Sequence, residues 1–141
     1  LLDEIGSGTS TYDGLSIAWA ITEKLSDIKC DTIFATHYHQ LNKLSEYYDN
    51  IENYNVLIRE EGENIEFIRK IVKGGTDKSY GIYVGKLAGI PSNVLDRAKE
   101  VQKNIEEKEE IVIKKEFRDS MLRRKNKTKE DDKSKGLGEY I

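Results

Sequence analysis

Apolar and polar residues follow one another in blocks that predict a strand, a helix and a second strand. An apolar run ends at Leu2, directly before two acidic residues. Apolar residues then recur at helical spacing over 15–25, and the β-branched, apolar stretch 31–36 is typical of a short buried strand. A strand–helix–strand unit requires parallel strands joined by a right-handed crossover. This part of the chain is therefore predicted to have an α/β fold.

The connection between the first strand and the helix is rich in glycine and hydroxyl residues. Residues 6–11 read Gly-Ser-Gly-Thr-Ser-Thr, and glycine lets a backbone turn tightly and approach a ligand closely. Thr11 or Asp13 is the expected N-cap of the helix. The segment thus has the composition of a ligand-facing loop.

A hairpin and two helices are predicted next. Residues 39–48 have a helical pattern, and the runs 53–58 and 65–72 alternate like strands on either side of a charged connector that contains a glycine. A short helix over 80–88 is stopped by Gly89 and Pro91. Then follows a longer helix with one apolar face, capped by Ser92 or Asn93 and extending to about residue 106. Two helices across this turn have the outline of a helix-turn-helix.

The charged residues are concentrated at the C-terminal end. Beyond residue 106 the apolar signal fades, and a mixed-sign polar run cannot bury enough apolar surface to offset its ordering entropy. We expect residues 109–141 to be a charged tail that is largely disordered, from about 120 onward. The expected domains are 1–76, the helix pair 77–108 and this tail.

Composition excludes several classes of protein. The 141 residues are 37% apolar and 35% charged, with a net charge of −3, so no overall basic character favours DNA binding. Cys30 is the single cysteine, which excludes an internal disulfide and a multi-cysteine metal site. No apolar run is long enough to cross a membrane, and no signal peptide is evident. We expect an intracellular protein, cytoplasmic or nucleoid-associated.

Asp3 and Glu4 are the first candidates for chemistry. An apolar strand that ends in Asp-Glu is typical of a nucleoside-triphosphatase site, because ligands bind beyond the carboxyl ends of parallel strands. Adjacent residues at a strand end point to different sides, so Asp3 would hold Mg²⁺, through water, while Glu4 would orient or deprotonate the attacking water. The companion phosphate loop should come earlier, so we expect this chain to be the C-terminal part of a longer ATPase. The alternative is an ordinary acidic pair on the surface.

His37 ends the second predicted strand, at the same edge of the sheet as Asp3 and Glu4. An imidazole there could hydrogen-bond the γ-phosphate or the attacking water; alternatively, a loop carbonyl satisfies it. His37 and His39 also alternate like metal ligands, but no cysteine, further histidine or suitably placed carboxylate completes a zinc site.

Two other stretches resemble functional motifs only superficially. Residues 75–79 look like a phosphate loop, but Asp77 takes the place of the glycine before Lys-Ser, and its charge would repel phosphate. The second helix of the helix-turn-helix lacks a clear basic stripe. Its apolar face suits packing against another helix or subunit better than reading DNA.

Three segments, in this order, resemble the MutS family of DNA mismatch-repair ATPases. Residues 1–14, Leu-Leu-Asp-Glu-Ile-Gly-Ser-Gly-Thr-Ser-Thr-Tyr-Asp-Gly, resemble the Walker B and D-loop region. Residues 34–38, Phe-Ala-Thr-His-Tyr, resemble the switch-histidine segment. Residues 78–82 with 87–91 and Arg97-Ala98 resemble the C-terminal dimerising helix-turn-helix, so the likeness covers about 1–106.

This resemblance implies the C-terminal part of an ABC-type P-loop ATPase domain. Asp3 would be the Mg²⁺ carboxylate, Glu4 the catalytic glutamate and His37 the switch histidine of ATP hydrolysis. The loop 9–13, with Ser10, Thr11 and Asp13 as nucleotide-binding candidates, would face the nucleotide site of a partner subunit. The helices 80–106 would pack across the dimer.

The partners implied by the resemblance are mismatched double-stranded DNA, held by parts of the protein outside this chain, a second MutS-type subunit and downstream repair factors. No membrane is implied. Two departures from the family pattern stand out: Ser7 replaces a frequent arginine, and Gly85 replaces a more usual alanine. The alternatives are another ABC-type ATPase, from chromosome maintenance or transport, and a non-catalytic dimerisation module.

Overall fold

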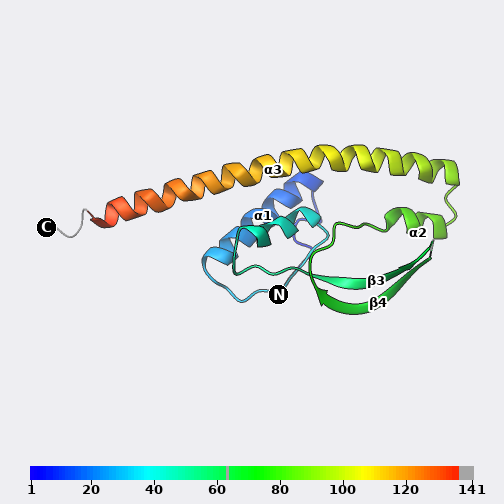
Figure 1. Ribbon diagram of the computed structural model, residues 1–141, viewed down its shortest axis with the longest axis horizontal. Coiled ribbons are helices and arrows are strands. Elements are labelled where there is room, and N and C mark those ends of the chain that lie inside the picture. The colour runs from blue at the N-terminus through cyan, green and yellow to red at the C-terminus, as the bar shows by residue number, and fades with distance from the viewer. Residues whose placement is uncertain (63, 137–141) are drawn as a thin grey trace. The chain divides into compact units, whose positions relative to one another are not determined.

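The computed structural model describes residues 1–62 and 64–136, which divide into two compact units, Leu1–Lys78 and the chain from Ser79 onward. The elements of the first unit are β1 (Leu2–Asp3), α1 (Thr11–Asp27), β2 (Phe34–Ala35), the 3₁₀ helix η1 (His39–Glu46), β3 (Tyr54–Glu61) and β4 (Asn64–Lys73). The second unit contains α2 (Gly81–Leu87) and α3 (Ser92–Gly136). Figure 1 labels the three α-helices and the strands β3 and β4. The structure is mixed α/β; the domain boundaries at 76 and 108 stay predictions.

β1 and β2 pair in parallel across the α1 crossover, as the sequence pattern predicted. Leu2 is opposite Phe34, and Asp3 is opposite Ala35. The Glu4 amide donates a hydrogen bond to the Ala35 carbonyl at 2.9 Å. β2 is shorter than the predicted strand over 31–36, because only Phe34 and Ala35 pair with residues of β1.

Helix α1 is capped by a residue other than the two predicted. Ser10 is the N-cap, with an extended backbone (φ −63°, ψ 152°), and its hydroxyl accepts a hydrogen bond from the Asp13 amide. Thr11 and Asp13 lie inside the first turn, so the prediction that one of them is the cap was wrong. Serine is as good an N-cap as aspartate, and local composition alone could not choose among the neighbouring cap residues.

The buried core of the first unit lies between α1 and the segment 38–48. Ala18 and Leu44 are fully buried. The same core contains other side chains that are less than a tenth exposed: Leu15, Trp19, Tyr38, Leu41 and Tyr48. A hydrogen bond of 2.9 Å from the Tyr48 hydroxyl to the Glu23 carboxylate joins the two segments. Burial of this apolar surface fixes α1 against the residues that follow β2.

β3 and β4 form the predicted antiparallel hairpin, drawn as a curved two-stranded ribbon in Figure 1. Val56 is opposite Ile71, and Ile58 is opposite Phe67. The register shifts between these pairs, where Arg69 has a left-handed backbone (φ 56°). Such a bulge bends the strand and strengthens its twist.

Helix α2 ends at Leu87, with Ala88 as its C-cap, so it stops just before Gly89 as the sequence predicted. Gly89 has φ +84°, and the amides of Gly89 and Ile90 donate to the carbonyls of Lys86 and Gly85, each at 3.0 Å. This is the hydrogen-bond pattern of a Schellman cap. A Cβ atom on Gly85 would lie 3.1–3.2 Å from Ile90 and Leu95 side-chain atoms, so the glycine lets the turn pack closely onto α2.

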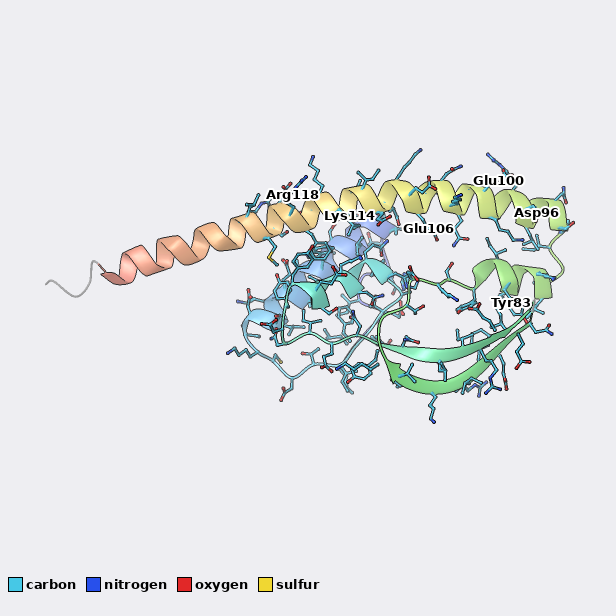
Figure 2. All side chains as sticks on the ribbon, viewed as in Figure 1. Tyr83, Asp96, Glu100, Glu106, Lys114 and Arg118 are labelled. Atoms are coloured by element: carbon cyan, nitrogen blue, oxygen red, sulfur yellow. The ribbon has the colours of Figure 1, made fainter. Side chains whose placement is uncertain are left out.

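The second helix of the pair is much longer than predicted. We expected it to end near residue 106 and the tail to be disordered from about 120, whereas α3 continues as a helix to Gly136; residues 137–141 lie outside the described part. The expectation rested on the lack of buried apolar surface. Helix formation can instead be local, since lysine, glutamate and arginine have high helix propensity and pair at i,i+4. Lys114 and Glu110 form such a pair at 2.6 Å, and Figure 2 shows charged residues from Asp96 to Arg118 along the helix.

Among residues 1–62 and 64–136, no helix is both long and apolar enough to cross a membrane.

Candidate functional site

Glu4 and His37 meet at the ends of the two parallel strands. His37 Nδ1 is hydrogen-bonded to Glu4 Oε2, although the residues are 33 positions apart in the chain. The strand ends are held in register by the amide of Glu4, which donates to Ala35, two residues before His37. The carboxylate and the imidazole therefore share one edge of the β1–β2 pair, where the sequence placed them.

The backbone of Glu4 sets the direction of its side chain. Glu4 has φ +48°, a left-handed conformation that is uncommon for a residue with a side chain. Its carbonyl accepts a hydrogen bond of 3.1 Å from the Ser7 amide, which closes a tight turn. β1 ends at Asp3, so Glu4 already belongs to the turn. We expected strand alternation to point the Asp3 and Glu4 side chains in different directions; the turn sets the direction of Glu4 instead.

The pair is open to solvent. The side chain of His37 is 59% exposed and that of Glu4 is 45% exposed. A polar side-chain contact this exposed typically contributes only about 0–1 kcal/mol to stability, so the fold gains little from it. Both groups remain accessible to a ligand or a water molecule.

Asp3 is exposed on β1, next to Glu4 in sequence and opposite Ala35. Carboxylate oxygen is a ligand type that Mg²⁺ prefers, and Mg²⁺ commonly uses one or two carboxylates together with water and phosphate oxygens. No group of three or more potential metal-ligating side chains occurs in the described part of the chain. The residues present thus fit a cation that is held mainly by water and substrate, and they do not form a cage of protein ligands.

Ser10, Thr11 and Asp13 lie together at the start of α1, and all three are exposed. Besides the Ser10 cap, the Thr9 hydroxyl donates to the Asp13 carboxylate at 3.4 Å. These contacts tie Thr9 and Ser10 to the first turn of α1, which begins at Thr11. Any role of these residues in binding nucleotide stays a prediction.

The loop after Glu4 is packed against both α1 and Tyr38, a contact that sequence reasoning missed. The Tyr38 hydroxyl donates a hydrogen bond of 3.1 Å to the Gly6 carbonyl. A Cβ atom on Gly14 would lie 2.1 Å from this hydroxyl and 2.3 Å from the Gly6 carbonyl oxygen, so Gly14 must be glycine here. Two features of the sequence could have indicated this contact: Tyr38 follows His37 directly, and Gly14 lies inside the predicted helix.

His39 lies away from the chemistry of His37. Its Nδ1 is 2.9 Å from the Thr76 carbonyl, and the Asn42 amide donates to the same carbonyl at 2.9 Å. A Cβ atom on Gly75 would lie 2.9 Å from Asn42, so this connector packs directly on η1. Residues 75–79, which resemble a phosphate loop, therefore start with two residues, Gly75 and Thr76, that pack against η1.

Comparison of the amino-acid sequence with known proteins identifies the family to which this chain belongs. The sequence profile described as MutS domain V matches residues 1–106. The chain is 57% identical over 110 residues to the DNA mismatch repair protein MutS of Caldicellulosiruptor bescii, a match that covers 76% of this chain and 13% of the relative. It is 54% identical over 107 residues to the protein of the same name from Clostridioides difficile, with 75% and 11% covered.

A longer match includes the charged half of α3. The DNA mismatch repair protein MutS of Clostridium perfringens is 50% identical over 134 residues, which cover 93% of this chain and 14% of the relative. A match of this length must extend past residue 106, into a segment in which the sequence alone suggested no resemblance. The chain spans only 11–14% of the length of these relatives.

Proposed function

This chain belongs to the MutS family, and we propose that it is the C-terminal part of the ATPase domain of a DNA mismatch-repair protein. It would supply the Walker B carboxylates, the D-loop, the switch histidine and the dimer helices of an ABC-type ATPase. The proposal rests on the family match over residues 1–106 together with one geometric observation, the contact between Glu4 and His37.

That contact supports ATP hydrolysis because it places a base and a hydrogen-bonding imidazole at one strand edge. In the proposed reaction a water oxygen attacks the γ-phosphorus, the bond to the β–γ bridging oxygen breaks, and ADP and phosphate result. Glu4 orients this water and accepts its proton. His37 holds Glu4 in place and donates toward the γ-phosphate.

Asp3 has a separate role in this proposal. Its carboxylate would hold Mg²⁺ through water, and the ion would neutralise charge on the phosphates. Ser10, Thr11 and Asp13, at the start of α1, would face nucleotide bound to a second subunit. A phosphate loop, from a part of the protein outside this chain, would complete the site.

The second unit supports pairing of two subunits. Val94, Val101 and Ile105 recur at helical spacing on α3 and are 51%, 39% and 50% exposed. An apolar row of this kind suits packing against another protein surface. We assign it to a second subunit of the MutS type. Mismatched double-stranded DNA and downstream repair factors would bind other parts of the protein.

Replacement of Glu4 by glutamine in a full-length protein that carries this chain tests the proposal. Glutamine keeps the size and removes the base, so turnover should fall by about 10²–10⁴-fold while ATP binding is retained. Glu46→Gln is a matched control, because Glu46 pairs with Lys43 on the surface of η1. Unchanged turnover in Glu4→Gln would contradict the proposal and would favour a non-catalytic dimerisation module.

A further inference from the structure

We propose that Tyr38 is a positioning residue for the Glu4–His37 pair: its hydroxyl fastens the loop that carries Glu4 to the segment that carries His37. This inference rests on the proposed ATPase function. It concerns a residue that acts through its neighbours and does not touch the substrate.

Tyr38 is held rigidly from several directions. Only 5% of its surface is exposed. Its amide donates to the Thr36 hydroxyl at 3.1 Å, and its carbonyl accepts from the Leu41 amide at 3.0 Å. Its ring also lies against His37, with centroids 4.5 Å apart. Because the ring of Tyr38 is fixed in this way, a hydrogen bond from its hydroxyl restricts the movement of the group that accepts it.

The hydroxyl binds the loop two residues after Glu4. It donates to the Gly6 carbonyl at 3.1 Å, while Gly6 has φ +89° and its Cβ position would be only 2.6 Å from the Gly14 Cα atom. The loop is therefore clamped between Tyr38 and the first turn of α1. Without the hydroxyl, the Gly6 carbonyl would lose this partner.

The geometric consequence is a closed chain of contacts. Glu4 is tied to the β2 segment by its own amide to Ala35 and by its carboxylate to His37. The bond from Tyr38 to Gly6 adds a third tie just beyond the left-handed turn at Glu4. Because the side chains of Glu4 and His37 are about half exposed, packing alone does not fix their geometry. The buried tyrosine beside them supplies that rigidity, which a catalytic pair requires.

The test is Tyr38→Phe in a full-length protein that carries this chain, with Tyr54→Phe as the matched control. Tyr54 lies on β3, is 56% exposed, and bonds Glu52 through its hydroxyl. We expect Tyr38→Phe to lower kcat about tenfold, the factor that corresponds to one ordinary hydrogen bond, with nucleotide affinity changed by less than about twofold. Amide exchange at Gly6 to Gly8 should accelerate in this variant. Tyr54→Phe should change neither kcat nor this amide exchange.

A double-mutant cycle separates positioning from general loosening of the fold. In a Glu4→Gln background, the Tyr38→Phe change should alter single-turnover hydrolysis by less than about twofold, because no catalytic base remains to be positioned. An unchanged kcat in Tyr38→Phe, or an equal loss in both backgrounds, would overturn the inference. Wild-type turnover in Glu4→Gln would instead overturn the ATPase assignment, whatever Tyr38→Phe does.

Discussion

The Glu4 carboxylate is hydrogen-bonded to the His37 imidazole across the ends of two parallel strands. The α1 crossover brings these residues together, and the left-handed turn at Glu4 aims the carboxylate. Uncommon backbone conformations of this kind persist where the surrounding structure fixes them, and they are frequent at functional sites. The fold thus brings together the two side chains to which we assign the proposed chemistry.

Gly14→Ala should destabilise the first unit by about 1–3 kcal/mol, since a new methyl group would overlap the Tyr38 hydroxyl and the Gly6 carbonyl. Thermal unfolding of the chain measures this. Gly8→Ala is the matched control, because a Cβ atom there has no neighbour within 4 Å. If both alanine variants unfolded at the temperature of the parent chain, the loop would not be packed as described.

Tyr48→Phe should cost about 1–3 kcal/mol, because the Glu23 carboxylate loses a donor in a partly buried place. Tyr54→Phe removes an equivalent bond, to Glu52, from an exposed site and should cost much less. Denaturant unfolding compares the two. Equal effects would show that burial does not strengthen the Tyr48 bond.

The Tyr48 bond also has a pH signature. Burial, followed by the hydrogen bond and charge of Glu23, raises the pKa of Tyr48 above its usual value. A raised pKa favours the protonated folded state, so this stabilisation is complete below about pH 10 and declines as the pH rises toward the folded-state pKa. The difference in stability between the parent chain and Tyr48→Phe should therefore shrink above pH 10. A difference that grows with pH there would contradict the assignment.

Asn42→Ala should loosen the connector 74–78, because its side chain donates to Thr76 and packs on Gly75. Amide exchange at Gly74 and Lys78 should accelerate by about tenfold, the equivalent of one hydrogen bond. Asn50→Ala is the control, since Asn50 binds Ser26 instead. Equal acceleration in both variants would indicate general loosening and not a local contact.

Lys114→Gln should reduce the helicity of α3 at low salt, because it removes the i,i+4 pair with Glu110. Circular dichroism at 222 nm measures the change, and added salt should abolish the difference from the parent chain by screening the pair. Lys115→Gln changes the neighbouring charge and serves as control. A salt-independent loss would mean that charge pairing is not its cause.

Much of the fold follows from local sequence patterns. The spacing of apolar residues predicted α1, alternation around Gly62 predicted the hairpin, and Gly89 predicted the end of α2. Each of these signals is contained in the segment that it describes. The strand–helix–strand rule then predicted the parallel pairing of β1 and β2, and with it the shared edge of Glu4 and His37.

The remainder depended on contacts that no local pattern contains. Ser10 caps α1 in place of its neighbours Thr11 and Asp13, a choice among equivalent residues. The role of Gly14 becomes visible only when Tyr38, far along the chain, is placed against it. The length of α3 was underestimated because burial was weighed above the intrinsic helix propensity of its charged residues.

The most direct test of the central claim is a double-mutant cycle on Glu4 and His37, measured by single-turnover ATP hydrolysis in a full-length protein that carries this chain. Residues that act as one unit lose their combined contribution when either is removed. We predict that His37→Ala slows hydrolysis less in a Glu4→Gln background than in the parent protein, because its effect through Glu4 is already lost, while all variants still bind nucleotide. Losses that multiply, or a Glu4→Gln rate equal to that of the parent protein, would contradict a shared catalytic site.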